Sequence, residues 1–298
     1  MPSLFSCPVV PIALEIYGAS HRKSNEIPPQ LRLYLFREPF TLPAARPRRP
    51  KESHKGGYLM ITLPIINRNT TYEIDPHIII GIGLNYHDHI AEHDKIGVQG
   101  FTSAIPEEPV MFSMTPNVVI GPEEPIIIPS YIDAYHFEDA RIDYEAELAF
   151  IVKDRCKDVA REDARKHILG YTCMNDVTQR NFQRTDKSGW FRGKSLDTFG
   201  PIGPAILLAE DLPDPGNLAI QCRLNGTLVQ SSNTCNMIFP VDVLLAFISR
   251  HITLGPGDIV STGTPAGVGQ IHPGDIVEIE IEGIGILRNP VQRECKTV

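Results

Sequence analysis

The sequence predicts a mainly β fold of the α+β class, and three observations support this. Short apolar runs bounded by glycine or proline follow one another from residue 72 onward. Only two segments, at about 160–168 and 240–252, have the apolar spacing of a helix. The regular alternation of strand and helix that a doubly wound sheet needs is absent.

The strand signals can be taken in chain order. HIIIGIG (77–83) and PIIIPSY (125–131) are runs of β-branched residues closed by glycine or framed by proline. The stretch 217–232 predicts a hairpin, because Asn225-Gly226 favours a type I′ turn. Two later strands, GDIVSTG (257–263) and GDIVEIEIEGIGIL (274–287), each begin with Gly-Asp.

The two helical segments have recognisable ends. The segment AREDARKHI at about 160–168 stops shortly before Gly170, which predicts a left-handed cap there. In the segment 240–252, Pro240 suits the first turn, and Leu244, Phe247 and Ile248 share one face.

Composition divides the chain and excludes some functions. The segment PAARPRRPKESHKGG (44–57) is basic and interrupted by Pro and Gly, so we expect residues 1–70 to be a loosely held arm or small appendage and residues 71–298 the main domain. A net charge of −8 argues against a nucleic-acid partner. The sequence has no apolar run near the roughly 20 residues that span a bilayer, so we expect no membrane partner.

Cysteine usage favours an intracellular protein. The six cysteines are scattered without a CxxC pair, as reduced core thiols would be, and we expect a cytoplasmic location. A mitochondrial presequence is the alternative. The acidic residues Glu15, Glu26 and Glu38 disfavour it.

Two carboxylates occupy neighbouring positions on one face of a predicted strand. In RIDYEAELAFI (141–151), alternation places Glu145 and Glu147 on the same side, and Ala149 and Ile151 continue that side into an apolar environment. A cation would relieve their repulsion. With Asp176 as a third oxygen ligand the set suits Mg²⁺, Mn²⁺ or Ca²⁺. The alternative is a solvated strand edge, which is the commoner explanation of an isolated Glu-x-Glu.

A histidine-rich segment, GLNYHDHIAEHDK (83–95), follows the strand at 77–83. If it is helical, His89 and Glu92 face the same way, and the carboxylate would make the imidazole a better base. A zinc site made with His87 and His93 is disfavoured, because no one conformation aligns all three histidines. A polar surface turn is the remaining alternative.

Two further segments have binding character. WFRGKSLDTFGPIGP (190–204) contains the only tryptophan, next to Arg192 and Lys194, and suggests a binding loop. STGTPAGVG (261–269) lacks the Gly-Lys-Ser/Thr of a P-loop. Its backbone N–H groups and Thr264 could instead hold a substrate carboxylate, unless the glycines only form a tight turn.

Taken in order, these motifs resemble those of the fumarylacetoacetate hydrolase family. The quoted segments GLNYHDHIAE, EEPVMFSMTP, DYEAELAFIV, GYTCMNDVTQRNFQ, RGKSLDTFGPIGP, MIFPVDVLLAFIS and LGPGDIVSTGTPAGVG carry the resemblance, which covers about residues 77–290. The similarity is greatest to the single-domain branch, which includes acylpyruvases, oxaloacetate decarboxylases and hydroxymuconate-type isomerases.

The resemblance implies a fold, a cofactor and a set of site residues. It implies the mixed β-roll of the family's C-terminal domain, a homodimer, and Mg²⁺ or Mn²⁺, with Ca²⁺ as a further option. The implied metal ligands are Glu145, Glu147 and Asp176, the implied catalytic residues are His89, Glu92 and Lys194, and the arginine and glutamine after the aspartate fall on Arg180 and Gln183. With Thr264 and Tyr86, these last two are the expected substrate-binding residues. One departure is the family's lysine before proline in FxKP, where this chain has Met114 or Thr115.

The function that these features predict is metal-dependent chemistry on a small 2-oxo or β-dicarbonyl acid. A divalent cation would stabilise the enolate that forms when a C–C bond breaks or a proton leaves. Hydrolysis of a C–C bond, with His89 and Glu92 activating water and Lys194 neutralising the oxyanion, is the first expectation. An oxaloacetate-type decarboxylase and a hydroxymuconate-type isomerase are alternatives on the same site, and an inactive binding or scaffold protein is the non-enzyme alternative.

Overall fold

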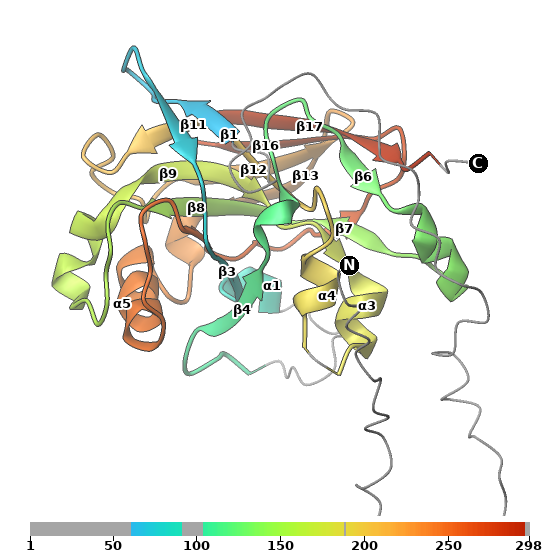
Figure 1. The fold of residues 1–298 in the computed structure, drawn as a ribbon, viewed down its shortest axis with the longest axis horizontal. Helices are drawn as coiled ribbons and strands as arrows, with labels where there is room; N and C mark the ends of the chain where they lie inside the picture. Colours follow the sequence, from blue (N-terminus) through green and yellow to red (C-terminus); the bar gives the residue numbers. More distant parts are fainter. Residues whose placement is uncertain (1–60, 91–103, 188, 296–298) are drawn as a thin grey trace, which may run out of the picture. The chain divides into compact units, whose positions relative to one another are not determined.

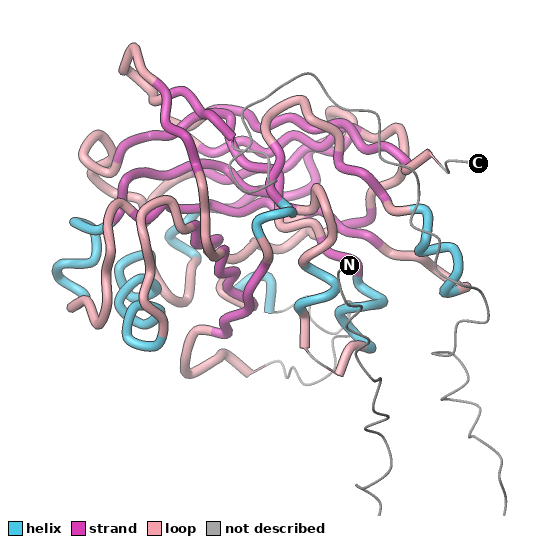
Figure 2. The backbone as a smooth tube through the Cα atoms, in the orientation of Figure 1, coloured by secondary structure: helices cyan, strands magenta, loops and turns pink. Residues whose placement is uncertain are grey.

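The described part of the chain is mainly β, as the sequence predicts. The computed structural model describes residues 61–90, 104–187 and 189–295 (Figure 1). Strands make up most of the regular structure in this part (Figure 2), and the helices that accompany them are short. Across these residues no helix is long and apolar enough to cross a membrane.

The largest sheet has seven strands, and the predicted site residue Glu147 lies in one of them. Its order is β4-β3-β14-β8-β9-β11-β5. The strands are β3 (Ile79–Gly83), β4 (Val110–Met114), β5 (Val119–Ile120), β8 (Ala146–Val152), β9 (Ile168–Asn175), β11 (Gly200–Leu208) and β14 (Ile259–Ser261). β3 and β14 are parallel neighbours near the centre of the sheet, and the residues of β8 are all buried. Burial on both faces explains why these strands read as continuous apolar runs.

A second sheet of five strands has the order β13-β12-β16-β17-β6. Its strands are β6 (Ile126–Ile128), β12 (Ala219–Leu224), β13 (Thr227–Asn233), β16 (Ile276–Ile281) and β17 (Gly285–Arg293). Asn225 and Gly226 form the turn between β12 and β13 with φ of 52° and 79°. Both left-handed values fit the type I′ turn, and this prediction is confirmed.

Two small sheets complete the strands. One has the order β10-β7-β15, with β7 (Ile142–Tyr144), β10 (Thr178–Gln179) and β15 (Gly269–Gln270). The other is the hairpin of β1 (Ile61–Pro64) and β2 (Thr71–Ile74). Ile61, Leu63 and Ile74 of this hairpin are buried against one face of the seven-stranded sheet. Residues 61–70 therefore pack with the domain predicted for 71–298, which begins earlier than the predicted boundary.

The apolar core has two parts, one on each face of β8. Leu148 and Phe150 pack in the larger cluster, which also contains residues of the five-stranded sheet and of α5. Ala149 and Ile151 pack in the smaller cluster with the β1–β2 hairpin. The strict alternation of β8 is thus retained inside the protein.

The α-helices are α1 (His87–Ile90), α3 (Arg180–Thr185), α4 (Phe191–Lys194) and α5 (Val241–His251), and they lie on the same side of the strands in Figure 1. The 3-10 helices are Pro116–Val118, Ser130–Tyr135, Arg161–His167 and Thr234–Asn236. In α5, Pro240 caps the N-terminus, Leu244 and Ile248 are buried, and Phe247 is half-buried.

The helix predicted at 160–168 is instead the 3-10 helix Arg161–His167, and β9 starts at Ile168. A segment this short gains little from α-helical hydrogen bonds. Gly170, predicted as its cap, lies inside β9, where a Cβ atom would be 2.6 Å from Ile206 and Leu207 of β11. The lack of a side chain at Gly170 therefore lets β9 and β11 pack closely.

Candidate metal and active site

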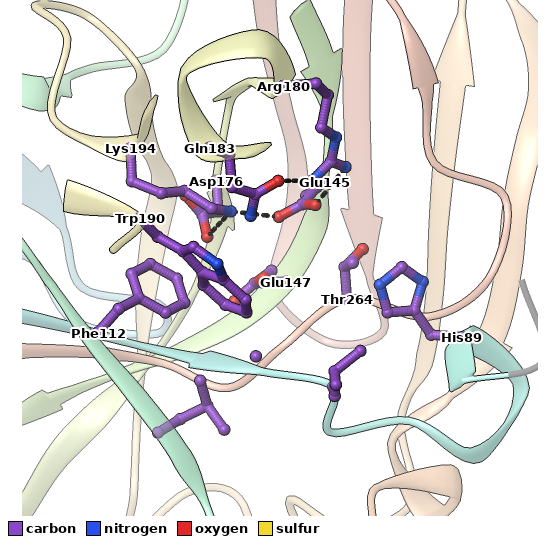
Figure 3. Close-up of a pocket in the computed structure, with 13 residues that line it drawn as sticks. His89, Phe112, Glu145, Glu147, Asp176, Arg180, Gln183, Trp190, Lys194 and Thr264 are labelled. Atoms are coloured by element: carbon purple, nitrogen blue, oxygen red, sulfur yellow. Dashed lines mark hydrogen bonds and ion pairs between the residues drawn. The ribbon is translucent and has the colours of Figure 1, made fainter. Parts of the chain in front are cut away.

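One cavity collects eight of the ten predicted site residues. Its volume is about 450 Å³ including the open mouth. It is lined by Ile82, Gly83, Leu84, His89, Phe112, Glu145, Glu147, Asp176, Arg180, Gln183, Trp190, Lys194 and Thr264. In Figure 3 the carboxylates lie between Phe112 and Trp190 on one side and His89 and Thr264 on the other.

The three predicted metal ligands converge. Glu145 lies between β7 and β8, Glu147 lies in β8, and Asp176 follows β9. The backbone N–H of Asp176 donates to the carbonyl of Glu145 at 3.0 Å, which fixes the two residues side by side. One carboxylate oxygen from each of the three residues lies within 4.8 Å of the others, and all three residues are buried.

Two buried cations contact these carboxylates. Lys194 on α4 places its Nζ 2.6 Å from Glu145 Oε2 and 2.5 Å from Asp176 Oδ2. Arg180 on α3 donates from Nη2 to Glu145 Oε1 at 2.6 Å. Glu145 is therefore held by both cations, whereas Asp176 is held by one.

Arg180 is itself fixed by Asp143, which the sequence did not mark as a site residue, and by Gln183, which it did. Its Nε donates to Asp143 Oδ2 at 2.7 Å, and Asp143 also accepts from Arg141 Nε at 2.8 Å. Gln183 accepts from Arg180 Nη1 at 3.0 Å. Asp143 lies two positions before Glu145, so the alternation that identified the glutamates could also have identified it.

Glu147 has a different environment. Its Oε2 accepts from the hydroxyl of Ser261 at 2.6 Å and from the backbone N–H of Gly263 at 2.8 Å. It forms no ion pair with any lysine or arginine that the structure describes. The Gly263 N–H belongs to the loop predicted to hold a substrate carboxylate, and here it holds a protein carboxylate.

The pKa values follow these contacts. Burial raises the pKa of Glu145, but the charges of Lys194 and Arg180 outweigh it and lower that pKa to about 2. Burial, together with repulsion by Asp176 and Glu145, raises the pKa of Glu147 well above its ordinary range. Burial raises the pKa of Asp176 to about 6, with Lys194 opposing and Glu145 adding to the shift.

The residues fit a divalent cation. The three carboxylates, if all are ionised, carry more negative charge than Lys194 and Arg180 can neutralise, and all five residues are buried. Asp176 Oδ1 is buried and has no hydrogen-bond partner. Buried charge without compensation is costly, and hard cations such as Mg²⁺ and Mn²⁺ prefer carboxylate oxygens. Among the residues described, this is the one group of His, Cys, Asp or Glu placed to hold a metal. His93 of the zinc alternative lies outside the described residues, so that alternative is not tested.

His89 reaches the cavity from a firmly attached segment. It is 7% exposed on α1. Just before α1, the side chain of Asn85 donates to the carbonyls of Phe239 and Thr262 at 3.0 and 2.7 Å and accepts from the Phe239 N–H at 2.8 Å. Glu92, the predicted partner of His89, lies outside the described residues, so their pairing stays a prediction.

The remaining predicted residues lie in different places. Thr264 lines the cavity, and its hydroxyl accepts from Gln230 Nε2 at 2.9 Å. Tyr86 is fully buried in the larger core cluster and does not line the cavity. Met114, at the departure from the family motif, is buried in the smaller cluster. Phe112 and Trp190 line the cavity, and of these only Trp190 lay in a segment interpreted as a binding loop.

Comparisons with known proteins give three informative relatives. The mitochondrial oxaloacetate tautomerase of Xenopus laevis is 40% identical over 225 residues, which cover 73% of this chain and 66% of that protein. The 2-hydroxyhepta-2,4-diene-1,7-dioate isomerase of Mycobacterium marinum is 37% identical, with a TM-score of 0.64 over 76% of this chain and 79% of its own. The fumarylpyruvate hydrolase of Pseudomonas aeruginosa, solved with Mn²⁺ and pyruvate, is 27% identical. Its TM-score is 0.68, and the match covers 79% of this chain and 97% of that chain.

The family assignment rests on the extent of the match. The profile described as the fumarylacetoacetate (FAA) hydrolase C-terminal domain matches residues 78–292, well over half of the chain. The solved structures share the fold over most of the described domain, which confirms the predicted fold type. The chain therefore belongs to the fumarylacetoacetate hydrolase family.

Proposed function

We propose that this protein is a divalent-metal-dependent enzyme that interconverts the keto and enol forms of a small 2-oxo acid. The observation that carries the proposal is the buried carboxylate set, Glu145, Glu147 and Asp176, with Lys194 among the carboxylates and His89 on the opposite side of the cavity. Such a site combines stabilisation of negative charge with a titratable group that can move a proton.

Each residue has a distinct part in this reaction. A divalent cation, when bound, supplies Lewis-acid stabilisation of the charge on the substrate's oxo oxygen. Lys194 uses two of its three N–H donors on Glu145 and Asp176, which leaves one for a substrate oxygen. An imidazole nitrogen of His89 removes the proton from the carbon next to the oxo group and returns it to that carbon or to the oxygen.

Tautomerisation is the preferred reaction because it needs only these groups. The resemblance to the Xenopus laevis oxaloacetate tautomerase supports it, and it suggests a C4 2-oxo dicarboxylic acid as substrate. Hydrolysis of a C–C bond is the second candidate, which the Pseudomonas aeruginosa fumarylpyruvate hydrolase favours. Hydrolysis requires, in addition to these groups, a water molecule for His89 and Glu92 to activate.

The test measures both reactions on the full chain with Mg²⁺ or Mn²⁺. Loss of the enol absorbance of oxaloacetate reports tautomerisation, and loss of the enol absorbance of fumarylpyruvate with formation of pyruvate reports hydrolysis. We expect wild type to accelerate tautomerisation, and His89→Gln to lower kcat by about 10²–10⁴-fold without loss of metal. His77→Gln, at an exposed histidine outside the cavity, is the matched control.

Three outcomes separate the candidates. Faster cleavage of fumarylpyruvate than tautomerisation would replace the first candidate by the second. Acceleration of neither reaction by metal-loaded protein would contradict both and favour a binding protein. A His89→Gln variant as active as His77→Gln would remove His89 from the chemistry.

The expected partners and location remain proposals as well. We expect a homodimer, which sedimentation of the full chain can test. The five described cysteines are free, and Cys156, Cys173 and Cys222 are buried, as expected of a protein kept in a reducing compartment. The cytoplasm stays the first expectation. The name of the Xenopus laevis relative supports the mitochondrial alternative.

A further inference from the structure

Two aromatic rings form one wall of the cavity. Phe112 is in β4 and Trp190 immediately precedes α4, so the rings come from separate parts of the chain. Their centroids are 5.2 Å apart with an interplanar angle of 60°. Both residues line the cavity, on the side opposite to His89 and Thr264 (Figure 3).

The rings are seated directly on the backbone of β3. A Cβ atom built on Gly83 would lie 2.5 and 2.6 Å from Trp190 Cζ3 and Cη2. A Cβ atom built on Gly81 would lie 2.2 Å from the Cζ atom of Phe112. Gly81 and Gly83 are two positions apart on one strand and so share a face. With no side chain between ring and strand, neither ring can retreat from the cavity toward β3.

The wall adjoins the groups that would hold a substrate. The Nζ atom of Lys194 lies 5.0 Å from the centroid of the Phe112 ring, while it contacts Glu145 and Asp176. An oxo acid bound beside Lys194 must therefore have its body near Phe112 and Trp190. The two rings themselves offer no positive charge to a second carboxylate of a substrate.

We propose that Trp190 and Phe112 are specificity-determining residues that limit the substrate to short 2-oxo acids. The proposal rests on the proposed function for the class of substrate. Trp190 sets the length of the chain that can follow the oxo carbon, because its ring is fixed against Gly83. Phe112 supports Trp190 and covers Lys194.

The experiment measures binding, so that it does not depend on turnover. Mg²⁺-loaded full chain is titrated calorimetrically with 2-oxobutanoate and with 2-oxohexanoate, and the ratio of the two dissociation constants is compared between variants. Trp190→Ala should shift this ratio at least about tenfold in favour of the longer acid, since each methylene accommodated in an apolar pocket is worth about 10–200-fold.

A second variant should act in the opposite direction. Gly83→Ala places a methyl group against the tip of the Trp190 ring, which must swing toward the cavity and disfavour the longer acid. Phe191→Ala is the matched control, because Phe191 is the neighbouring aromatic residue, is 46% exposed and does not line the cavity. Titration with Mg²⁺ alone should give the same affinity in all of these proteins.

The results distinguish this proposal from the function it rests on. If the ratio of dissociation constants in Trp190→Ala stayed within twofold of wild type, the specificity role of Trp190 and Phe112 would be refuted. An equal shift of this ratio in Phe191→Ala would refute it as well. Failure of wild type to bind either acid would overturn it too. If the ratio shifts as expected but oxaloacetate is not turned over, the specificity role is supported and the tautomerase proposal is contradicted. If oxaloacetate is turned over but the ratio does not shift, the tautomerase proposal is supported and the specificity role is contradicted.

Discussion

Replacing Glu147 by Gln should make the metal-free protein more stable and abolish its response to metal. Of the three carboxylates that line the cavity, Glu147 is the one without an ion-pair partner among the described residues. Its Oε2 accepts hydrogen bonds from the Ser261 hydroxyl and the Gly263 backbone N–H. A glutamine side-chain oxygen can accept the same two hydrogen bonds. The substitution therefore removes a buried charge and keeps its contacts.

The expected gain follows from the spacing of the carboxylates. Two like charges 4.8 Å apart, the upper limit within this group, repel by about 3.5 kcal/mol at an effective dielectric constant of 20. Attraction by Lys194 and partial protonation of Glu147 offset much of this repulsion. We therefore expect the free energy of unfolding to rise by about 1–3 kcal/mol at neutral or higher pH.

The gain should depend on pH with a definite sign. The pKa of Glu147 is higher in the folded protein than its ordinary value of 4.5, so the folded state binds this proton more tightly than the unfolded chain does. Stability contributed by such a group is lost as the pH rises above the unfolded pKa. The advantage of Glu147→Gln should be near zero below about pH 4 and grow toward neutral pH.

Urea denaturation followed by circular dichroism measures the effect, first in EDTA and then with Mg²⁺. Wild type should gain about 2.7 kcal/mol when Mg²⁺ is at 100 times its dissociation constant, and the variant should gain almost nothing. Glu73→Gln, at an exposed glutamate on β2, controls for loss of a charge. A variant less stable than wild type in EDTA at pH 8, or one with unchanged Mg²⁺ affinity, would refute this account of the site.

Four other perturbations test the cavity and the packing around it. Lys194→Met should cost about 3–5 kcal/mol in EDTA, because it leaves buried carboxylates uncompensated, and Mg²⁺ should restore part of that loss in urea denaturation. Asn85→Ala should leave buried backbone groups unsatisfied at about 1–3 kcal/mol each, and hydrogen exchange around α1 should accelerate. A chain that starts at Lys51 should keep the Mg²⁺ affinity of the full chain, since every described residue that lines the cavity follows residue 81. A chain that starts at Thr71 should be less stable, because it lacks Leu63 of β1, which is 1% exposed.

Local patterns predicted several strands and the converging carboxylates. Two predicted strands are divided in the structure: 141–151 forms β7 and β8 in different sheets, and 274–287 runs from β16 into β17, which pair as a hairpin. Alternation in RIDYEAELAFI predicted that Glu145 and Glu147 share a face, and both line the same cavity. The end of an apolar run predicted that Asp176 lies at the end of a strand, and it directly follows β9. These inferences needed only the two-residue period of a strand.

The partners of these residues could not be predicted because they depend on long-range pairing. Ser261 reaches Glu147 only because β14 pairs with β8, although 114 positions separate the two residues. Phe112 covers Lys194 because β4 pairs with β3 at the edge of the same sheet. Sequence spacing carries no signal for such neighbours.

The distribution of charge along one strand direction indicates where a metal would bind. Asp143, Glu145 and Glu147 occupy alternate positions, and their compensation decreases in that order. Within the described part of the chain, Asp143 pairs with two arginines, Glu145 with an arginine and a lysine, and Glu147 with neutral donors alone. The shifts in pKa follow, since that of Glu145 is lowered and those of Glu147 and Asp176 are raised. A divalent cation would complete the compensation at Glu147 and Asp176, which pair with no arginine among the described residues. Arg180 and Lys194 fix the Glu145 carboxylate, and we expect a cation to offset the charge that remains on the other two carboxylates.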